Sequence, residues 1–187
     1  MTSETKSKEA KASRDTQTFY RVNFNNNIGL LQIADNKANL LISINTLLIS
    51  AIIAISGYGA ISEKIGSLGI RVLLPLVLIM LSCLISTILA VKAAKPTLIR
   101  SKAAEDSNQV SSILFFGESS SYTLPQYLEK IATIIPDHKA MYSHMSIALY
   151  QQGKVLNKKY NLLAYAYGIF MFGIASGALA FIGFLIW

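Results

Sequence analysis

The chain has 187 residues, of which 52% are hydrophobic and only 14% are charged, and its formal net charge is +7. Soluble domains carry about 25% charged residues, so this composition excludes an ordinary soluble domain and indicates that much of the chain lies in lipid. The positive charge is then confined to the parts that stay in water, where it favours anionic partners such as lipid headgroups, nucleotides and nucleic acid.

The N-terminal stretch is polar. Residues 1–18 are rich in Ser, Thr, Lys and Glu and show no apolar periodicity. This composition predicts a disordered basic N-terminus, and it lacks the apolar core of a cleavable signal peptide. From Phe19 the apolar residues follow a helical pattern, so we expect residues 19–36 to form a cytosolic helix that leads into the membrane.

Three apolar runs follow, at residues 40–57, 72–91 and 162–187. Each is close to the ~20 residues that span a hydrocarbon core, so the predicted fold is all-α, with three transmembrane helices and cytosolic helical extensions. The expected parts are transmembrane helices 1 and 2 within 37–93, a periplasmic hairpin at 58–71, a cytosolic helical region at 94–160 and transmembrane helix 3 at 161–187.

The 94–160 region has its own helix signals. The second span is expected to continue as helix over residues 95–113. Thr123 with Gln126 three residues later is the pattern of a capping box, and it predicts a short helix that Pro136 ends. Asp137 can then cap a further helix, which meets no strong breaker before it enters the third span.

Polar residues recur along the first span at steps of three and four, which place them on one helical face. The row consists of Gln32, Asp35, Asn36, Asn39, Ser43, Thr46 and Ser50. Because polar groups in lipid are costly, the row is expected either to form a hydrogen-bonded seam between helices or to line a pore. The pore-lining candidates are Asp35, Asn39, Ser43, Thr46 and Ser50.

Asp35 itself has two possible roles. At the mouth of a pore its carboxylate would attract cations. It can equally form an ion pair with Lys37 or with a basic residue on a neighbouring helix. Three spans are too few to enclose a lumen, so a pore requires a cyclic homo-oligomer, for which we expect four subunits.

Other rows of residues indicate packing. Gly173 and Gly177 form a small-xxx-small motif that allows two helices to approach closely. A second row, at steps of three and four, predicts a coiled-coil-like contact and consists of Tyr142, Met145, Leu149, Gln152, Leu156, Tyr160 and Leu163.

The basic cytosolic helices offer candidates for an anion site. These are Arg100, Lys102, Lys154, Lys158 and Lys159, with Tyr160 as a stacking neighbour. The alternative for Lys158 and Lys159 is that they reach to anionic headgroups. Aromatic residues near the 117–122 loop (Phe115, Phe116, Tyr122 and Tyr127) could stack on a nucleotide, although for the two phenylalanines a packing role is favoured.

Signals for chemistry are missing. His138 and His144 are six residues apart and have no acidic or Cys partner that completes a tetrahedral metal site. Cys83 is the only cysteine and lies in an apolar run, as a buried thiol does. Neither a phosphate-binding glycine loop nor a nucleophile elbow occurs. We therefore expect no enzyme activity, catalytic residue, metal or cofactor.

Residues 27–45, with the core Ala34-Asp-Asn-Lys-Ala38, resemble the transmembrane effector domain of Pycsar-type antiphage systems. The resemblance continues at residues 113–117, 152–160 and in the following span, and it covers nearly the whole chain after residue 19. It implies a membrane-disrupting effector that is switched by a nucleotide or oligonucleotide from an enzyme encoded nearby.

The implied function is a homo-oligomeric gated pore or ion channel in the bacterial inner membrane, which causes abortive infection. Many relatives carry a separate soluble sensing domain, for which these 187 residues leave no room. Either the 94–160 region binds the signal, with a subunit interface as one place for the site, or a partner protein does. The signal could open the protein or hold it shut. The alternative is a non-conducting membrane anchor that recruits or restrains a cytosolic partner.

The distribution of Lys and Arg predicts the topology. Fifteen of them lie before the first span or between the second and third, and two lie in or beside the 58–71 hairpin. By the positive-inside rule, a reporter inserted near Ser120 is expected in the cytosol and one fused after Trp187 in the periplasm. The opposite assignment in a reporter-activity assay would contradict both this topology and a cytosolic ligand site.

Overall fold

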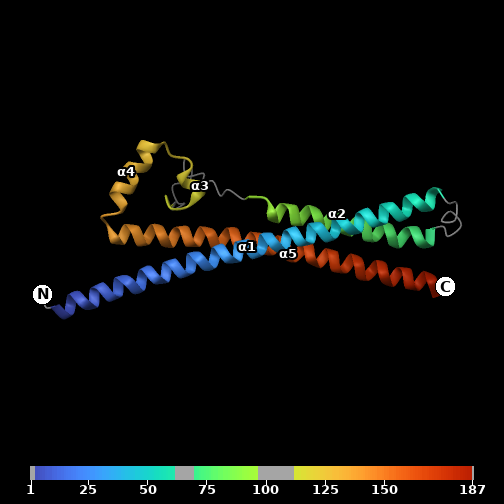
Figure 1. The fold of residues 1–187 in the computed structure, drawn as a ribbon, viewed down its shortest axis with the longest axis horizontal. Helices are drawn as coiled ribbons and strands as arrows, with labels where there is room; N and C mark the ends of the chain where they lie inside the picture. The colour runs from blue at the N-terminus through green and yellow to red at the C-terminus, as the bar shows by residue number, and fades with distance from the viewer. Residues whose placement is uncertain (1–2, 62–69, 97–111, 187) are drawn as a thin grey trace. The chain divides into compact units, whose positions relative to one another are not determined.

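The computed structural model describes residues 3–61, 70–96 and 112–186 (Figure 1). The described residues contain five helices and no strand: α1 (Ser3–Ile61), α2 (Ile70–Ala94), α3 (Phe116–Ser119), α4 (Leu124–Ile134) and α5 (His138–Ile186). The chain divides into two compact units. One consists of residues 1–32 and 96–157, the other of residues 33–95 and 158–187. We call them the α4 unit and the span unit.

The α1 helix begins at Ser3, so the prediction that residues 1–18 are disordered is wrong for the described residues 3–18. The composition argument undervalued helix propensity. Lys, Glu and Ala are strong helix formers, and Glu4 precedes Lys8 by four residues, which is the favourable order for such a pair. The polar stretch and the expected 19–36 helix are therefore one helix with the first span.

Three helices of this protein, α1, α2 and α5, each contain a stretch long and apolar enough to cross a membrane. The three predicted apolar runs thus each lie in a helix that could span a membrane. Pro75 is the sixth residue of α2, beyond the first turn where a proline was expected, so its missing N–H removes one hydrogen bond of the helix. The predicted hairpin at 58–71 falls mostly on residues 62–69, which lie outside the described residues.

The span unit is held together by small and apolar side chains. One cluster joins Ala34 and Ala38 of α1 to Ala93 of α2 and Leu163 of α5. A second joins Leu41, Ala90 and Ala166 in the same way. Alanine at these positions lets three helix backbones approach closely, which is how helices associate where water provides no hydrophobic driving force.

The predicted small-xxx-small motif is one of these close approaches. A Cβ atom at Gly173 would overlap the side chain of Ser82, and one at Gly177 would overlap that of Ile79. Both neighbours belong to α2. The motif therefore joins α5 to α2 within one chain.

In the α4 unit, the predicted helix signals are confirmed. The backbone N–H of Thr123 donates to Gln126 Oε1 (3.1 Å) at the start of α4. Asp137 Oδ1 accepts from the N–H groups of Lys139 and Ala140 at the start of α5. The α5 helix then runs unbroken from His138 to Ile186, as its lack of a breaker predicted.

The N-terminal part of α1 packs on α5 through an aromatic pair. The rings of Tyr20 and Tyr142 are stacked with centroids 5.7 Å apart. The Tyr20 hydroxyl also lies 2.7 Å from Ser146 Oγ. Tyr142 is the first residue of the packing row predicted on α5.

The expected helix over 95–113 is not seen in its described parts. The α2 helix ends at Ala94, and residues 112–115 form a turn. Pro96 is the physical reason for the end of α2, because proline disfavours helical conformation in the residue before it. Residues 97–111, which include Arg100 and Lys102, lie outside the described residues.

The glycine contacts yield a stability prediction. Gly173→Ala should force Ser82 to move, and its hydroxyl would lose the bond to the Ile79 carbonyl (2.8 Å). We expect a loss of about 1–3 kcal/mol, typical of overpacking, in SDS-induced unfolding followed by circular dichroism.

Gly168→Ala is the matched control, because a Cβ there meets nothing within 4 Å. It should leave stability unchanged or slightly raised, since alanine favours helix. Equal effects of the two substitutions would show that the α2–α5 approach is not close at Gly173.

Candidate functional site

The α1 helix has two opposite faces in the span unit. Its buried row consists of Ala34, Ala38, Leu41, Asn45 and Ile52, all 9% exposed or less. With 3.6 residues per turn, these positions share one side of the helix. The polar row lies on the other side.

The polar row is exposed along the first span: its exposed residues are Gln32, Asn36, Asn39, Ser43, Thr46 and Ser50. Ser43 Oγ donates to the Asn39 carbonyl (2.9 Å) and Thr46 Oγ1 to that of Ile42 (2.8 Å). Their hydroxyl protons are thus satisfied within α1 and make no bond to α2 or α5. The row is therefore not the seam between the described helices of one chain.

The hydrogen-bonded seam is built instead around Asn45. Its Nδ2 donates to Ser86 Oγ (3.0 Å), and Ser86 Oγ donates to the Ala166 carbonyl (2.9 Å). Asn45 and Ser86 are fully buried. Asn45 Oδ1 has no hydrogen-bond partner among the described residues.

Sequence reasoning did not select Asn45. The signal was its spacing, four residues after Leu41 and seven after Ala38, which puts an amide on the small-residue face. An amide on that face must hydrogen-bond across helices, because lipid offers no alternative partner.

Asp35 and Lys159 form an ion pair. Lys159 Nζ lies 2.5 Å from Asp35 Oδ1, with the lysine side chain 8% exposed and the aspartate side chain 44% exposed. A buried ammonium group needs such a partner. Asp35 was a candidate for the pore mouth and Lys159 a candidate for anion binding. An ion pair with a basic residue on a neighbouring helix was one of the two roles expected for Asp35.

The other anion candidates are dispersed. Lys154 and Lys158 are exposed, and Lys154 Nζ lies 4.8 Å from the centroid of the Tyr150 ring. Tyr160 is half-buried and packs against the cluster that contains Ala34 and Leu163. Within the described residues, the candidates do not converge on one hollow.

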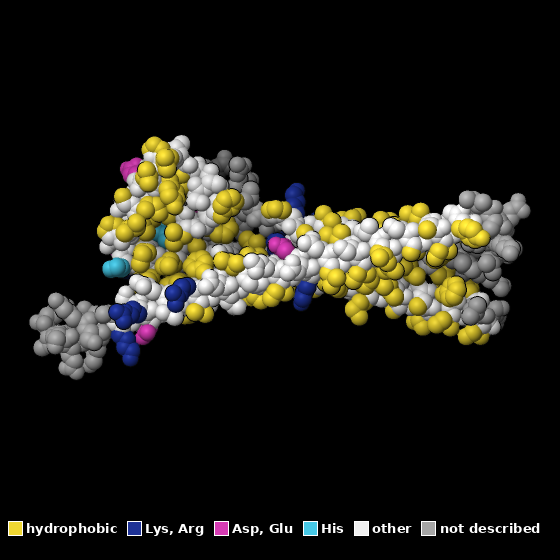
Figure 2. All heavy atoms as spheres, in the orientation of Figure 1, with side chains coloured by type: hydrophobic (Ala, Val, Ile, Leu, Met, Phe, Trp, Pro, Cys, Tyr) yellow, Lys and Arg dark blue, Asp and Glu magenta, His cyan; other side chains and the backbone are white. Residues whose placement is uncertain are grey.

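Among the described residues of the span unit, every charged residue except Arg71 lies at one end. Residues 39–58, 73–91 and 160–186 contain no Asp, Glu, Lys or Arg, whereas the segments next to them hold Asp35, Lys37, Lys92, Lys95, Lys158 and Lys159. The face seen in Figure 2 is accordingly hydrophobic and uncharged along the part of α5 that leads to the C-terminus. The Asp35–Lys159 pair therefore lies at this charged end, next to the uncharged stretches of α1 and α5.

Comparison with known proteins gives one family. The family model described as the Pycsar effector protein domain matches residues 19–187. Neither a curated protein nor a solved structure matches the chain.

The ion pair can be tested by exchange of its charges. Lys159→Asp alone should bring two carboxylates together and lower the free energy of unfolding in detergent. The loss should stay below the ~3–5 kcal/mol typical of breaking a fully buried pair, because the Asp35 side chain is 44% exposed. The double variant Asp35→Lys with Lys159→Asp should recover part of that loss. The control is Lys158→Asp, which reverses the charge of the exposed neighbouring lysine. It should change the midpoint of unfolding in detergent little. No recovery in the double variant would show that the two side chains do not interact.

Proposed function

Because the chain belongs to the Pycsar effector family, we propose that this membrane protein is the effector of a nucleotide-signalled antiphage system and that it acts as a gated pore or ion channel in the inner membrane. The family match supports the membrane-effector role and a cyclic nucleotide made by a partner enzyme. The pore, its oligomeric state and its topology are our proposal. It involves no enzymatic step.

The single observation that carries the pore is the exposed polar row of α1. Ser43, Thr46 and Ser50 lie within the apolar stretch of the first span and face away from the helices of their own chain. Asn39 extends the row toward the charged end. Facing lipid, the row would be unfavourable, whereas copies of α1 around a common axis would place it against water or against the same row of a neighbour.

A ring of subunits follows from this geometry. Each chain contributes one polar face, and a lumen requires several such faces. Four subunits remain our working number. The α2 and α5 helices would then form the outer layer, in agreement with the exposed apolar side chains of Leu81, Ile88, Phe172 and Leu179.

One observation favours a second candidate function, a non-conducting anchor that binds a cytosolic partner. Leu124 and Leu128 of α4 are 70% and 55% exposed, and the neighbouring Phe116 is 70% exposed. The packing role favoured for the phenylalanines therefore does not describe Phe116 in one chain. Exposed apolar side chains of this kind are typical of protein-binding surfaces.

The pore is tested by removal of its polar groups. In Ser43→Leu with Thr46→Val, the lumen would lose two hydroxyl rings and dewet, so ion flux into liposomes should fall on the order of tenfold while the oligomer stays intact. Flux and oligomer mass should be measured on the same preparation.

Ala51→Leu is the matched control, because Ala51 is an exposed small residue of the same span outside the polar row. It should leave both quantities unchanged. If ion flux falls only in proportion to the amount of oligomer, the polar row forms contacts between subunits and does not line a pore. Unchanged flux from an intact oligomer would contradict a pore-lining role, and a wild-type protein that never conducts would favour the anchor.

A further inference from the structure

A hollow lies beside α4, within the α4 unit. It consists of a cavity of about 510 Å³ lined by Tyr122, Gln126, Glu129 and Lys130 together with Ser121 and Thr133. A second cavity of about 190 Å³ shares Tyr122, Lys130 and Thr133 with the first and adds His144. Small-molecule sites commonly measure ~300–1,000 Å³, so the hollow can accept a ligand the size of a mononucleotide.

The ring of Tyr122 is held in place at this hollow. Its hydroxyl donates to Glu118 Oε1 (2.9 Å), and Glu118 is 6% exposed. A buried carboxylate is costly unless it is hydrogen-bonded, so this bond fixes both side chains. Lys130 Nζ lies 4.7 Å from the centre of the same ring, which positions a cation at the hollow.

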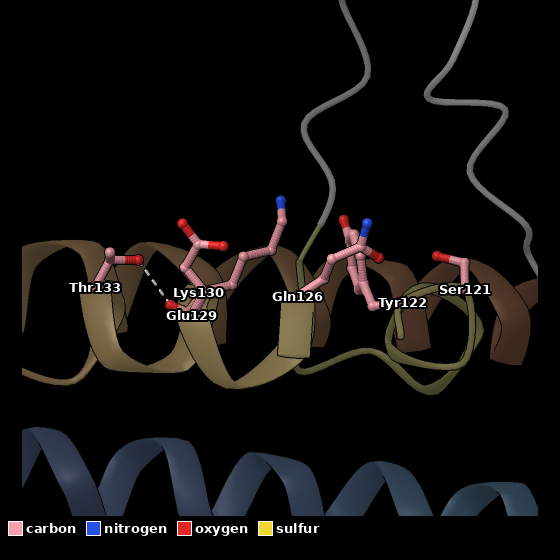
Figure 3. A pocket seen from close by; sticks show the side chains of 6 residues that line it. All are labelled: Ser121, Tyr122, Gln126, Glu129, Lys130 and Thr133. Carbon is pink, nitrogen blue, oxygen red and sulfur yellow. Dashed lines mark hydrogen bonds between the residues drawn. The ribbon is translucent and has the colours of Figure 1, made fainter. Parts of the chain in front are cut away.

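The lining side chains point to one side. In Figure 3, those of Gln126, Glu129 and Lys130 rise from α4 on the side where Tyr122 lies. Thr133 is turned back, and its hydroxyl donates to the Lys130 carbonyl (2.8 Å). An amide, a carboxylate and an ammonium group are therefore presented together, at a helix that the Gln126 cap holds at its start.

One polar atom at the hollow has no partner. His144 Nδ1 is buried, and no described residue hydrogen-bonds to it. The backbone carbonyl of His144 accepts from Ser112 Oγ (2.7 Å), so the helix is fixed at that residue while the ring nitrogen is not satisfied. Because this nitrogen is buried, it does not open into the smaller cavity, which the rest of the His144 side chain lines.

We propose that this hollow is the site at which the chain itself binds the nucleotide signal, through a single phosphate group. The phosphate lies at Lys130, and Glu129 and Gln126 bind hydroxyl or amino groups of the sugar and base. Lys130 is the one lysine or arginine among the described residues that line the two cavities, so it can pair with one phosphate charge, which is what a cyclic mononucleotide carries.

This inference rests on the proposed function and replaces the candidate set Arg100, Lys102, Lys154, Lys158 and Lys159 by a different one. The hollow was not visible in the sequence, because Tyr122, Lys130 and His144 are 8 and 14 residues apart and lie on three segments. Their convergence depends on the turn at Pro136, after which α5 runs back beside α4.

Binding to the full-length protein in nanodiscs tests the site. Cyclic AMP, cyclic CMP, cyclic GMP and cyclic UMP are titrated separately by calorimetry, with cyclic di-AMP as the doubly charged comparison. At least one mononucleotide should bind, and Lys130→Gln should raise its Kd about tenfold, which is ~1.4 kcal/mol. Lys139→Gln is the matched control, an exposed lysine outside the hollow, and should leave Kd unchanged.

The proposal is overturned if none of the four mononucleotides binds, if Lys130→Gln binds as wild type does, or if cyclic di-AMP binds tightly through Lys130.

Ion flux measured on the same preparations separates this inference from the pore. If the protein conducts ions and Lys130→Gln does not change nucleotide binding, the proposed binding site is contradicted and the pore is supported. If Lys130→Gln weakens nucleotide binding but the wild-type protein never conducts ions, the binding site is supported and the pore is contradicted.

Discussion

The span unit depends on one chain of hydrogen bonds. From Asn45 through Ser86 to the Ala166 carbonyl, two bonds connect α1, α2 and α5 at one level of the apolar region. Alanines toward the charged end, and Gly173 and Gly177 on the other side of this level, allow the backbones to approach. Apolar contacts alone do not fix how each helix is rotated about its axis. An amide that would be unsatisfied in lipid does fix it, because any large rotation of α1 breaks the bond from Asn45 Nδ2 to Ser86 Oγ and leaves the amide without a partner.

That rotation decides what α1 shows to its surroundings. With Asn45 inside, the helical period carries Asn39, Ser43 and Thr46 to the outside, and no smaller adjustment of the same bundle can bury both rows. The same rotation of α1 therefore both buries the Asn45 amide and exposes the polar row. The ion pair of Asp35 and Lys159 repeats the constraint at the charged end, so the orientation of α1 is fixed at two levels.

Local patterns determined how much could be predicted from the sequence. The three spans, the start of α4 and the unbroken α5 each depend on residues within one or two turns, and all were predictable. Residues 3–18 were missed because the polarity of the segment was weighed and the propensity of Lys, Glu and Ala was not. Periodicity placed the polar row on one face but could not show which face meets α2 and α5. The sequence could not predict which residue pairs with Asp35, because 124 residues separate it from Lys159.

The same separations set an order of assembly during synthesis. At ~5–20 residues per second, Ser86 follows Asn45 by roughly 2–8 s, whereas Lys159 follows Asp35 by roughly 6–25 s. The α1–α2 hairpin can thus form while the Ser86 hydroxyl still lacks its acceptor on α5. During the same interval Asp35 lacks its ion-pair partner Lys159. We expect the arrival of α5 to be the committing step of biogenesis, since it supplies the missing acceptor and the missing cation together.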